Sequence, residues 1–125
     1  MHARSNTKST GNGKVLKKSR DKRRHEFGGY FAATRVGDKK VVEKRRGRGG
    51  TVLPKLKRID VANVLTKQGY KKAKISGVIE SKDNRNFARL GIITKGSVIQ
   101  TELGKAVVLN RPGREGHVVA KLLEG

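Results

Sequence analysis

Apolar residues are distributed very unevenly along this chain, and their distribution limits where a folded core can form. Residues 1–50 contain 12 apolar side chains, whereas residues 51–125 contain 30. A segment with so few apolar residues cannot bury enough surface to offset the conformational entropy lost on ordering. We therefore predict a boundary after Gly50, with an extension over residues 1–50 and a small folded domain over residues 51–125.

The second segment has the pattern of a β domain. Short runs rich in Val, Ile and Leu alternate with breaks at Gly, Asn, Asp and Pro, and a turn roughly every 8–12 residues is typical of a sandwich or barrel. The expected strands are 59–65, 72–80, 87–93, 97–101, 106–109 and 117–123, with 51–56 as an edge strand because it contains Pro54. Closure removes exposed sheet edges, so a barrel is favoured over an open sheet. The predicted fold class is all-β: a small antiparallel β-barrel with a long basic, mostly extended N-terminal arm.

The N-terminal arm has weaker secondary-structure signals. Residues 19–25 could form one short helix capped by Ser19, and Val41-Val42 could form a short strand. The cations between Ser19 and His25 would repel one another in such a helix unless phosphates lay between them. Extended structure that becomes ordered on a partner is therefore the main expectation.

The charge of the chain points to an anionic partner. Lys and Arg number 31 against 10 Asp and Glu, which gives a formal net charge of +21 and a pI near 11.1. Such a charge repels itself in a compact state, and nucleic acid, an anionic membrane or an acidic protein could neutralise it. No run approaches the roughly 18 apolar residues of a membrane span, and no secretory signal follows Met1. Cysteine is absent, which fits a cytoplasmic location.

Two basic clusters interspersed with glycine favour nucleic acid among these partners. They are Lys14, Lys17, Lys18, Arg20, Lys22, Arg23 and Arg24, and then Lys39, Lys40, Lys44, Arg45, Arg46 and Arg48. Arg offers a planar fork of donors that suits phosphates and bases, and Gly lets two backbones approach closely. We interpret the arm as a chain that threads through a folded polyanion. The plainer alternative is a solvated basic tail or a targeting signal.

Three of the five aromatic residues, Phe27, Tyr30 and Phe31, lie together in the arm. They could stack on unpaired bases. Packing of these rings against protein is the favoured interpretation.

Catalytic patterns are missing from the sequence. Gly11-Asn12-Gly13-Lys14 continues with Val15 rather than Ser or Thr, so it is not an NTPase phosphate loop. The three histidines have no metal-ligand spacing, and the acidic residues form no paired pattern. We expect neither an enzyme nor a bound metal, cofactor or small-molecule substrate.

Specific short motifs occur in order over nearly the whole chain, at residues 4–5, 10–11, 26–28, 33–37, 48–50, 60–64, 92–96, 101–106 and 111–113. In this order they resemble a known family, the archaeal and eukaryotic small-subunit ribosomal proteins numbered eight, at the length of an archaeal member. Asn12 stands where the family usually has a second Gly, and the 14–24 segment is slightly longer than usual. The resemblance implies assembly into the small ribosomal subunit, a β-barrel body, rRNA contacts from the arm and no catalysis.

The predicted partners are small-subunit rRNA and neighbouring ribosomal proteins, without a membrane. The residues predicted to bind rRNA are Arg4, Lys8, Lys14, Lys17, Lys18, Arg20, Lys22, Arg23, Arg24, Arg35, Lys44, Arg45, Arg46, Arg48, Lys95, Arg111 and Arg114, and Lys105 is a further loop contact. The first role of Lys95-Gly96 and Arg111-Pro112-Gly113 is to form turns, and contact with RNA is secondary. A free RNA- or DNA-compacting protein, or a module that binds an acidic protein, is the competing hypothesis.

Overall fold

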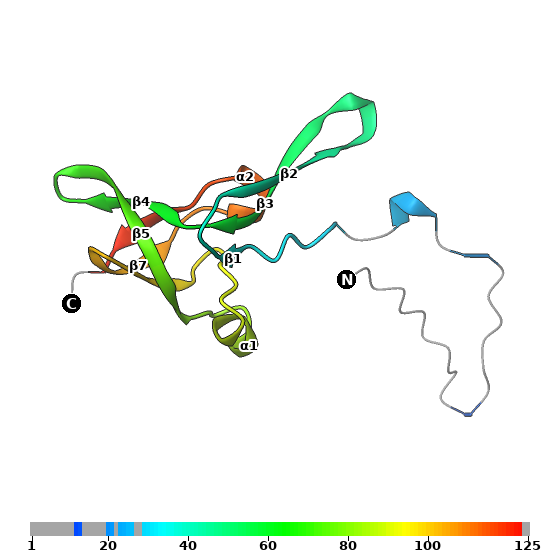
Figure 1. Ribbon diagram of the computed structural model, residues 1–125. Helices are drawn as coiled ribbons and strands as arrows, with labels where there is room; N and C mark the ends of the chain where they lie inside the picture. Colours follow the sequence, from blue (N-terminus) through cyan, green and yellow to red (C-terminus); the bar gives the residue numbers. More distant parts are fainter. Residues whose placement is uncertain (1–11, 14–19, 22, 27–28, 124–125) are drawn as a thin grey trace. The chain divides into compact units, whose positions relative to one another are not determined.

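The computed structural model describes residues 12–13, 20–21, 23–26 and 29–123, and the chain divides into two compact units. Unit 1 comprises Met1–Phe31 and unit 2 comprises Ala32–Gly125 (Figure 1). The described part of unit 1 includes one 3-10 helix, η1 (Arg24–Glu26). Of the helix considered over residues 19–25, the structure therefore describes only this short turn, and Ser19 and Lys22 lie outside the described residues.

Unit 2 is built on a closed five-stranded barrel with the strand order β4-β5-β6-β7-β8. The strands are β4 (Val61–Thr66), β5 (Gly69–Glu80), β6 (Val98–Thr101), β7 (Gly104–Val108) and β8 (Val119–Leu122). Neighbours from β4 to β8 are antiparallel, but β8 closes on β4 in parallel. The predicted barrel is confirmed, and its purely antiparallel character was wrong. Strands alternate in direction along a meander, so the first and fifth run the same way and must pair in parallel.

A three-stranded sheet, in the order β1-β3-β2, adjoins the barrel in the same unit. Its strands are β1 (Arg35–Val36), β2 (Val41–Arg46) and β3 (Val52–Ile59). The short strand expected at Val41-Val42 is present and continues to Arg46. Pro54 pairs with Lys44 of β2, while β1 reaches only Arg58 and Ile59 of β3. Pro54 therefore has a neighbouring strand on one side only, which is where its missing N–H is tolerated.

Three short helices complete unit 2: η2 (Arg48–Gly50), α1 (Arg85–Arg89) and α2 (Pro112–Glu115). The strand predicted over residues 87–93 was wrong, because this segment begins within α1. Asn84 caps that helix, since its side-chain oxygen accepts a hydrogen bond from the Asn86 N–H at 2.9 Å. The fold is therefore mostly β with short helices rather than all-β.

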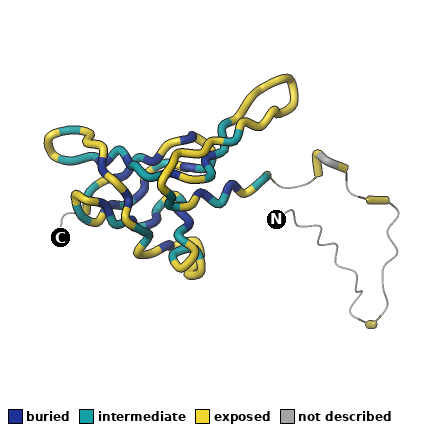
Figure 2. Tube along the Cα trace, viewed as in Figure 1, coloured by how far each residue is buried: buried dark blue, intermediate teal, exposed yellow. Residues whose placement is uncertain are grey.

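The core follows from the alternation of side chains along the strands. On β4, Ala62 and Val64 are buried, and on β5, Ala73 and Ile75 are buried (Figure 2). Ile99, Ala106, Val108 and Ala120 fill the same cluster from β6, β7 and β8. Leu56 and Ile59 of β3 also belong to it, so the outer sheet shares the barrel's core.

Residues 32–34 are held tightly to the rest of unit 2. The Thr34 hydroxyl donates to the Leu56 carbonyl at 2.7 Å, and the Ile93 N–H donates to the Thr34 carbonyl at 2.8 Å. A Cβ on Gly113 of α2 would lie 2.9 Å from the Ala32 Cβ. The compact unit 2 thus begins at Ala32, well before Gly50, and it includes the strands β1 and β2.

The close approach of Gly113 to Ala32 predicts the effect of adding one methyl group. We expect Gly113→Ala to lower the free energy of unfolding by about 1–3 kcal/mol, the usual effect of overpacking. Gly77→Ala on β5 is the matched control, because nothing lies within 4 Å of a Cβ built there. Urea unfolding of both variants measures the difference. Equal midpoints would show that α2 can move away from Ala32 without loss of stability.

Candidate nucleic-acid interface

The β2–β3 hairpin projects from the barrel and is exposed over most of its length (Figures 1 and 2). Residues 39–58 contain nine Lys or Arg and one acidic residue, Glu43, so this twenty-residue stretch carries a net charge of 9 − 1 = +8. Like charges this close repel one another unless an anion lies between them. The hairpin is therefore the strongest candidate for contact with a polyanion in unit 2.

The register of the two strands gives the hairpin two different faces. Glu43 pairs with Lys55 across the strands, and Arg45 pairs with Leu53. On this face the Arg45 Nε lies 3.0 Å from the Glu43 Oε1, and the Lys57 Nζ lies 3.7 Å from the Glu43 Oε2. One carboxylate thus partly neutralises this face. Exposed pairs of this kind contribute only about 0–1 kcal/mol, so they order side chains more than they stabilise the fold.

The opposite face carries Lys44 and Arg46 beside apolar residues of β3. Lys44 pairs with Pro54, and Arg46 pairs with Val52, whose side chain is 55% exposed. Within the described parts of the chain, no carboxylate forms an ion pair with Lys44, Arg46 or Arg48. These three cations are therefore available to an external anion.

The tip of the hairpin depends on glycine. The Gly47 N–H donates to the Thr51 carbonyl at 2.6 Å and closes the loop. Gly49 and Gly50 have φ values of 75° and 81°, which other residues rarely adopt. The tip therefore exposes backbone next to Arg46 and Arg48, which permits close approach of a phosphate backbone.

In unit 1, Arg20 is engaged by a carboxylate. Its guanidinium donates to both Glu26 carboxylate oxygens, at 3.0 and 2.7 Å, and the Arg23 N–H donates to the Glu26 Oε2 at 2.9 Å. These hydrogen bonds, first of all the one from Arg20, lower the pKa of Glu26 to about 2. The Glu26 carboxylate therefore offsets the charge of Arg20, which is less available to phosphate than its position in the sequence indicates.

The cations on the barrel loops stand on well-defined turns. The Asn110 side-chain amide donates to the Glu115 Oε2 at 3.0 Å and to the His117 carbonyl at 2.9 Å. The hydrogen bond from Asn110 and a second one from the Arg111 N–H lower the pKa of Glu115. Arg111 and Arg114 lie within this turn, and both are exposed. Gly96, with a φ of 82°, follows the exposed Lys95 in another turn.

The structure brings together some of the predicted rRNA-binding residues and separates others. Lys44, Arg45, Arg46 and Arg48 share the β2–β3 hairpin, and Arg35 of β1 lies beside Arg58 in the register. Lys95, Lys105, Arg111 and Arg114 are all exposed: Lys95 lies in a loop, Lys105 in β7, Arg111 at the start of α2 and Arg114 within α2. Arg20 and Arg23 are exposed in unit 1, and Arg24 lies in η1. Outside the described residues are Arg4, Lys8, Lys14, Lys17, Lys18 and Lys22.

The arm aromatics are described in part. Phe27 lies outside the described residues, Tyr30 is half-buried and Phe31 is 46% exposed. Their packing against protein, or stacking on bases, stays a prediction.

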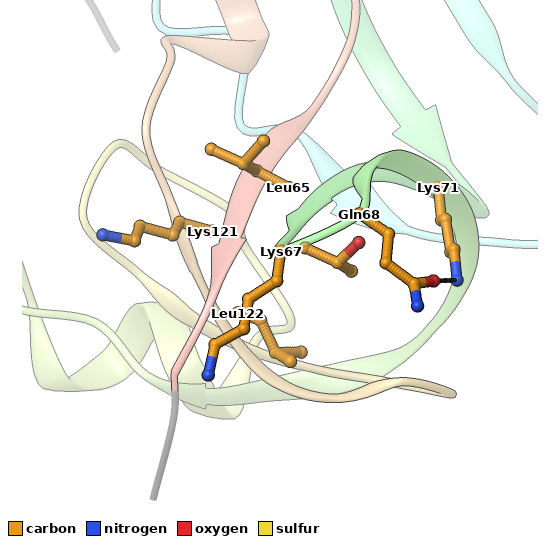
Figure 3. Close-up of a pocket in the computed structure, with 7 residues that line it drawn as sticks. Leu65, Lys67, Gln68, Lys71, Lys121 and Leu122 are labelled. Atoms are coloured by element: carbon orange, nitrogen blue, oxygen red, sulfur yellow. Dashed lines mark hydrogen bonds between the residues drawn. The ribbon is translucent and has the colours of Figure 1, made fainter.

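Sequence reasoning missed a second lysine cluster, on the β4–β5 hairpin and β8. Figure 3 shows it around a depression lined by Leu65, Thr66, Lys67, Gln68, Lys71, Lys121 and Leu122. The Lys71 Nζ donates to the Gln68 Oε1 at 2.8 Å, whereas the Lys121 side chain extends away from the ribbon (Figure 3). The available signal was the run Tyr70-Lys71-Lys72-Ala73-Lys74, in which a strand pattern is interleaved with cations and an aromatic residue.

Among residues 12–13, 20–21, 23–26 and 29–123, no cluster of His, Cys, Asp and Glu could hold a metal ion. The helices in this part of the chain are also too short and too polar to cross a membrane. Fold and charge together define a small basic β-barrel protein with a projecting cationic hairpin, a class that presents cations to a polyanion.

Comparison with known proteins identifies the family of the chain. Residues 2–123 match the family described as Ribosomal protein S8e. The small ribosomal subunit protein eS8 of Sulfolobus acidocaldarius is 48% identical over 108 residues, covering 85% of this chain and 84% of the relative. The protein of the same name from Sulfurisphaera tokodaii is 46% identical over 109 residues, covering 86% and 85%. That from Nanoarchaeum equitans is 41% identical over 114 residues, covering 90% and 89%.

The chain therefore belongs to the ribosomal protein S8e family. The resemblance seen in its sequence motifs is confirmed. It is a ribosomal protein and not an enzyme, and its place is the ribosome in the cytoplasm.

The low pKa of Glu26 predicts how the Arg20 pair responds to pH. The folded pKa of about 2 lies below the ordinary 4.5, so the pair's contribution is complete above pH 4.5 and is lost as the pH falls through about 2. A carboxyl-detected NMR titration measures this pKa directly. In Arg20→Gln we expect it to move up toward 4.5, because the largest cause is removed. An unchanged Glu26 pKa in that variant would mean that Arg20 is not its partner.

Proposed function

We propose that this protein is a structural constituent of the small ribosomal subunit, which binds and stabilises rRNA through its basic extension and its barrel loops. The observation that carries the proposal is the concentration of nine cations against one acid in residues 39–58, on a hairpin that projects from the barrel. The printed names of the relatives, all small ribosomal subunit proteins, support the same assembly.

The binding mechanism is electrostatic first. Each Lys or Arg that neutralises a phosphate releases a condensed counterion, and this release drives association. The β2–β3 hairpin supplies unpaired cations at Lys44, Arg46 and Arg48, next to a glycine tip that admits close backbone approach. The barrel docks beside it, with Lys95, Lys105, Arg111 and Arg114 as further contacts.

Geometry adds to charge at the arginines. A guanidinium can form two parallel hydrogen bonds to a phosphate or stack on a base, which an ammonium cannot copy. In this proposal residues 1–50 act as one rRNA-binding extension, although β1 and β2 fold with unit 2, and residues 51–125 act as the barrel domain. Neighbouring ribosomal proteins are further partners.

Substitution of the arginines at the hairpin tip separates the contribution of charge from that of guanidinium geometry. We expect Arg46→Lys and Arg48→Lys to reduce incorporation into the small subunit, each at a cost of about 1 kcal/mol, because lysine cannot form the bidentate hydrogen bonds. Arg85→Lys and Arg89→Lys, on the exposed helix α1, are matched controls with the same chemical change. The measurement is competition between variant and wild-type chains during subunit reconstitution. Equal incorporation of all four variants would show that the hairpin contributes only its positive charge.

Salt dependence tests the phosphate contacts, and co-sedimentation tests whether the partner is the subunit itself. Replacing Lys44 and Arg46 by Gln should flatten the plot of log affinity against log salt by roughly 0.7–0.9 for each phosphate that is no longer neutralised. The wild-type chain should co-sediment with small subunits at moderate salt. Absence of co-sedimentation, with binding to arbitrary RNA or DNA retained, would instead identify a free nucleic-acid-compacting protein.

A further inference from the structure

The outer face of β5, β4 and β8 differs from the hairpin in its chemistry. Asn63 of β4 lies at its centre, with Lys72 of β5 on one side and Val119 of β8 on the other. The next row holds Tyr70, Leu65 and Lys121. These residues point outward, because the residues that alternate with them along the strands, Ala62, Val64, Ala73 and Ala120, belong to the buried core. An aromatic ring, an amide and two ammonium groups thus share one sheet surface.

Tyr70 is unusually exposed for an aromatic side chain. It is 65% exposed, more than any other large hydrophobic residue in the described part of the molecule. An aromatic ring with a polar tip is well suited to a partner that covers the ring and leaves the hydroxyl wet. Its exposure on a regular strand, rather than on a loop, gives the ring a fixed platform.

The Asn63 side chain is available for recognition. Within the described residues, no hydrogen bond engages its amide, although its backbone N–H donates to the Val118 carbonyl at 2.9 Å. An amide offers both donors and an acceptor, whereas the surrounding lysines offer donors only. The face can therefore complement a group that itself presents both a donor and an acceptor.

Two adjoining depressions, of about 410 and 340 Å³, lie on this face. Both include Asn63, Lys72 and His117, and the larger also includes Tyr70 and Lys71. The His117 Nδ1 lies 3.1 Å from the Glu115 carbonyl oxygen, which orients the ring. The surface is therefore hollowed beside the exposed tyrosine, with lysine and histidine at its margins.

We propose that this face binds an unpaired nucleotide of RNA, with the base stacked on Tyr70, the base edge hydrogen-bonded to Asn63 and the phosphate held by Lys72. The proposal rests on the proposed function and adds a second contact to the hairpin, one that recognises single-stranded rather than double-stranded RNA. Base edges present donors and acceptors together, and every base has a face that can stack. An acidic protein segment would match the lysines but would leave the aromatic ring and the amide without a specific partner.

The chain offers a direct readout, because it contains only two tyrosines, Tyr30 and Tyr70, and no tryptophan. The full chain labelled with ¹³C-tyrosine should show two sets of ring signals, and Tyr70→Phe assigns them. We expect a short single-stranded oligoribonucleotide to move the Tyr70 ring protons upfield, as stacking under a base requires. A shift confined to Tyr30, or no shift on saturation, would overturn the proposal.

Affinity measurements test the same site with matched variants. Tyr70→Ala should weaken binding of the single strand by about fivefold to about a hundredfold, the usual effect of removing one stacking platform. Tyr70→Phe, which keeps the ring, should bind like the wild type. Leu90→Ala truncates another exposed side chain, 53% exposed at the end of α1, and should have no effect. Lys72→Gln should weaken binding more than Lys82→Gln, which removes the same charge elsewhere on the surface.

The comparison of RNA forms decides between stacking and charge. Tyr70→Ala and Asn63→Ala should leave binding to a duplex with the same number of phosphates unchanged, because paired bases cannot reach the ring. Equal weakening for duplex and single strand would overturn the proposal. So would a Tyr70→Ala variant that no longer binds a purified acidic ribosomal protein but still binds RNA. Either result would leave the proposed function standing, because the hairpin could still carry incorporation into the subunit. Failure of the wild-type chain to enter the subunit would refute the proposed function itself.

Discussion

The rest of unit 2 depends on the way Leu56 of β3 is held in the core. Its side chain is fully buried in the core, its carbonyl accepts the Thr34 hydroxyl, and its strand pairs with both β1 and β2. One residue therefore joins the barrel core, the segment that leads in from Ala32 and the base of the cationic hairpin. Because β3 is anchored in this way, the distal half of the hairpin can project without a core of its own.

Charge and packing are separated in space in this molecule. The core cluster holds small and medium apolar side chains, among them Ala62, Val64 and Ile99, and the lysines and arginines lie on the strand faces and turns around it. Three of the ten acidic residues bind neighbouring side chains: Glu43 within the hairpin, Glu26 on Arg20, and Glu115 inside the Asn110 turn. These carboxylates order particular side chains but leave most of the positive charge uncompensated, and in the proposed function this uncompensated charge favours assembly with rRNA.

The barrel was predictable because short apolar runs recur between regularly spaced turn residues, and because closure leaves no sheet edge exposed. The helix α1 was not, since its start depends on one hydrogen bond, which the Asn84 side-chain oxygen accepts from the Asn86 N–H, rather than on an apolar pattern. The boundary after Gly50 reflected apolar content alone. A strand such as β2 needs little apolar surface when the backbone of β3 supplies its hydrogen bonds and Leu56 supplies the anchor.

The sequence by itself determined that this chain has a small β core, a large excess of cations and the motifs of a ribosomal protein family, because each of these is a property of composition, local alternation or residue order. Only the tertiary structure decided which side chains share a surface. Asn63, Tyr70 and Lys72 meet because β4 and β5 pair in one register, and Lys121 joins them because β8 closes the barrel in parallel. Register and closure follow from burying all five strands around one core, which no short stretch of sequence specifies alone.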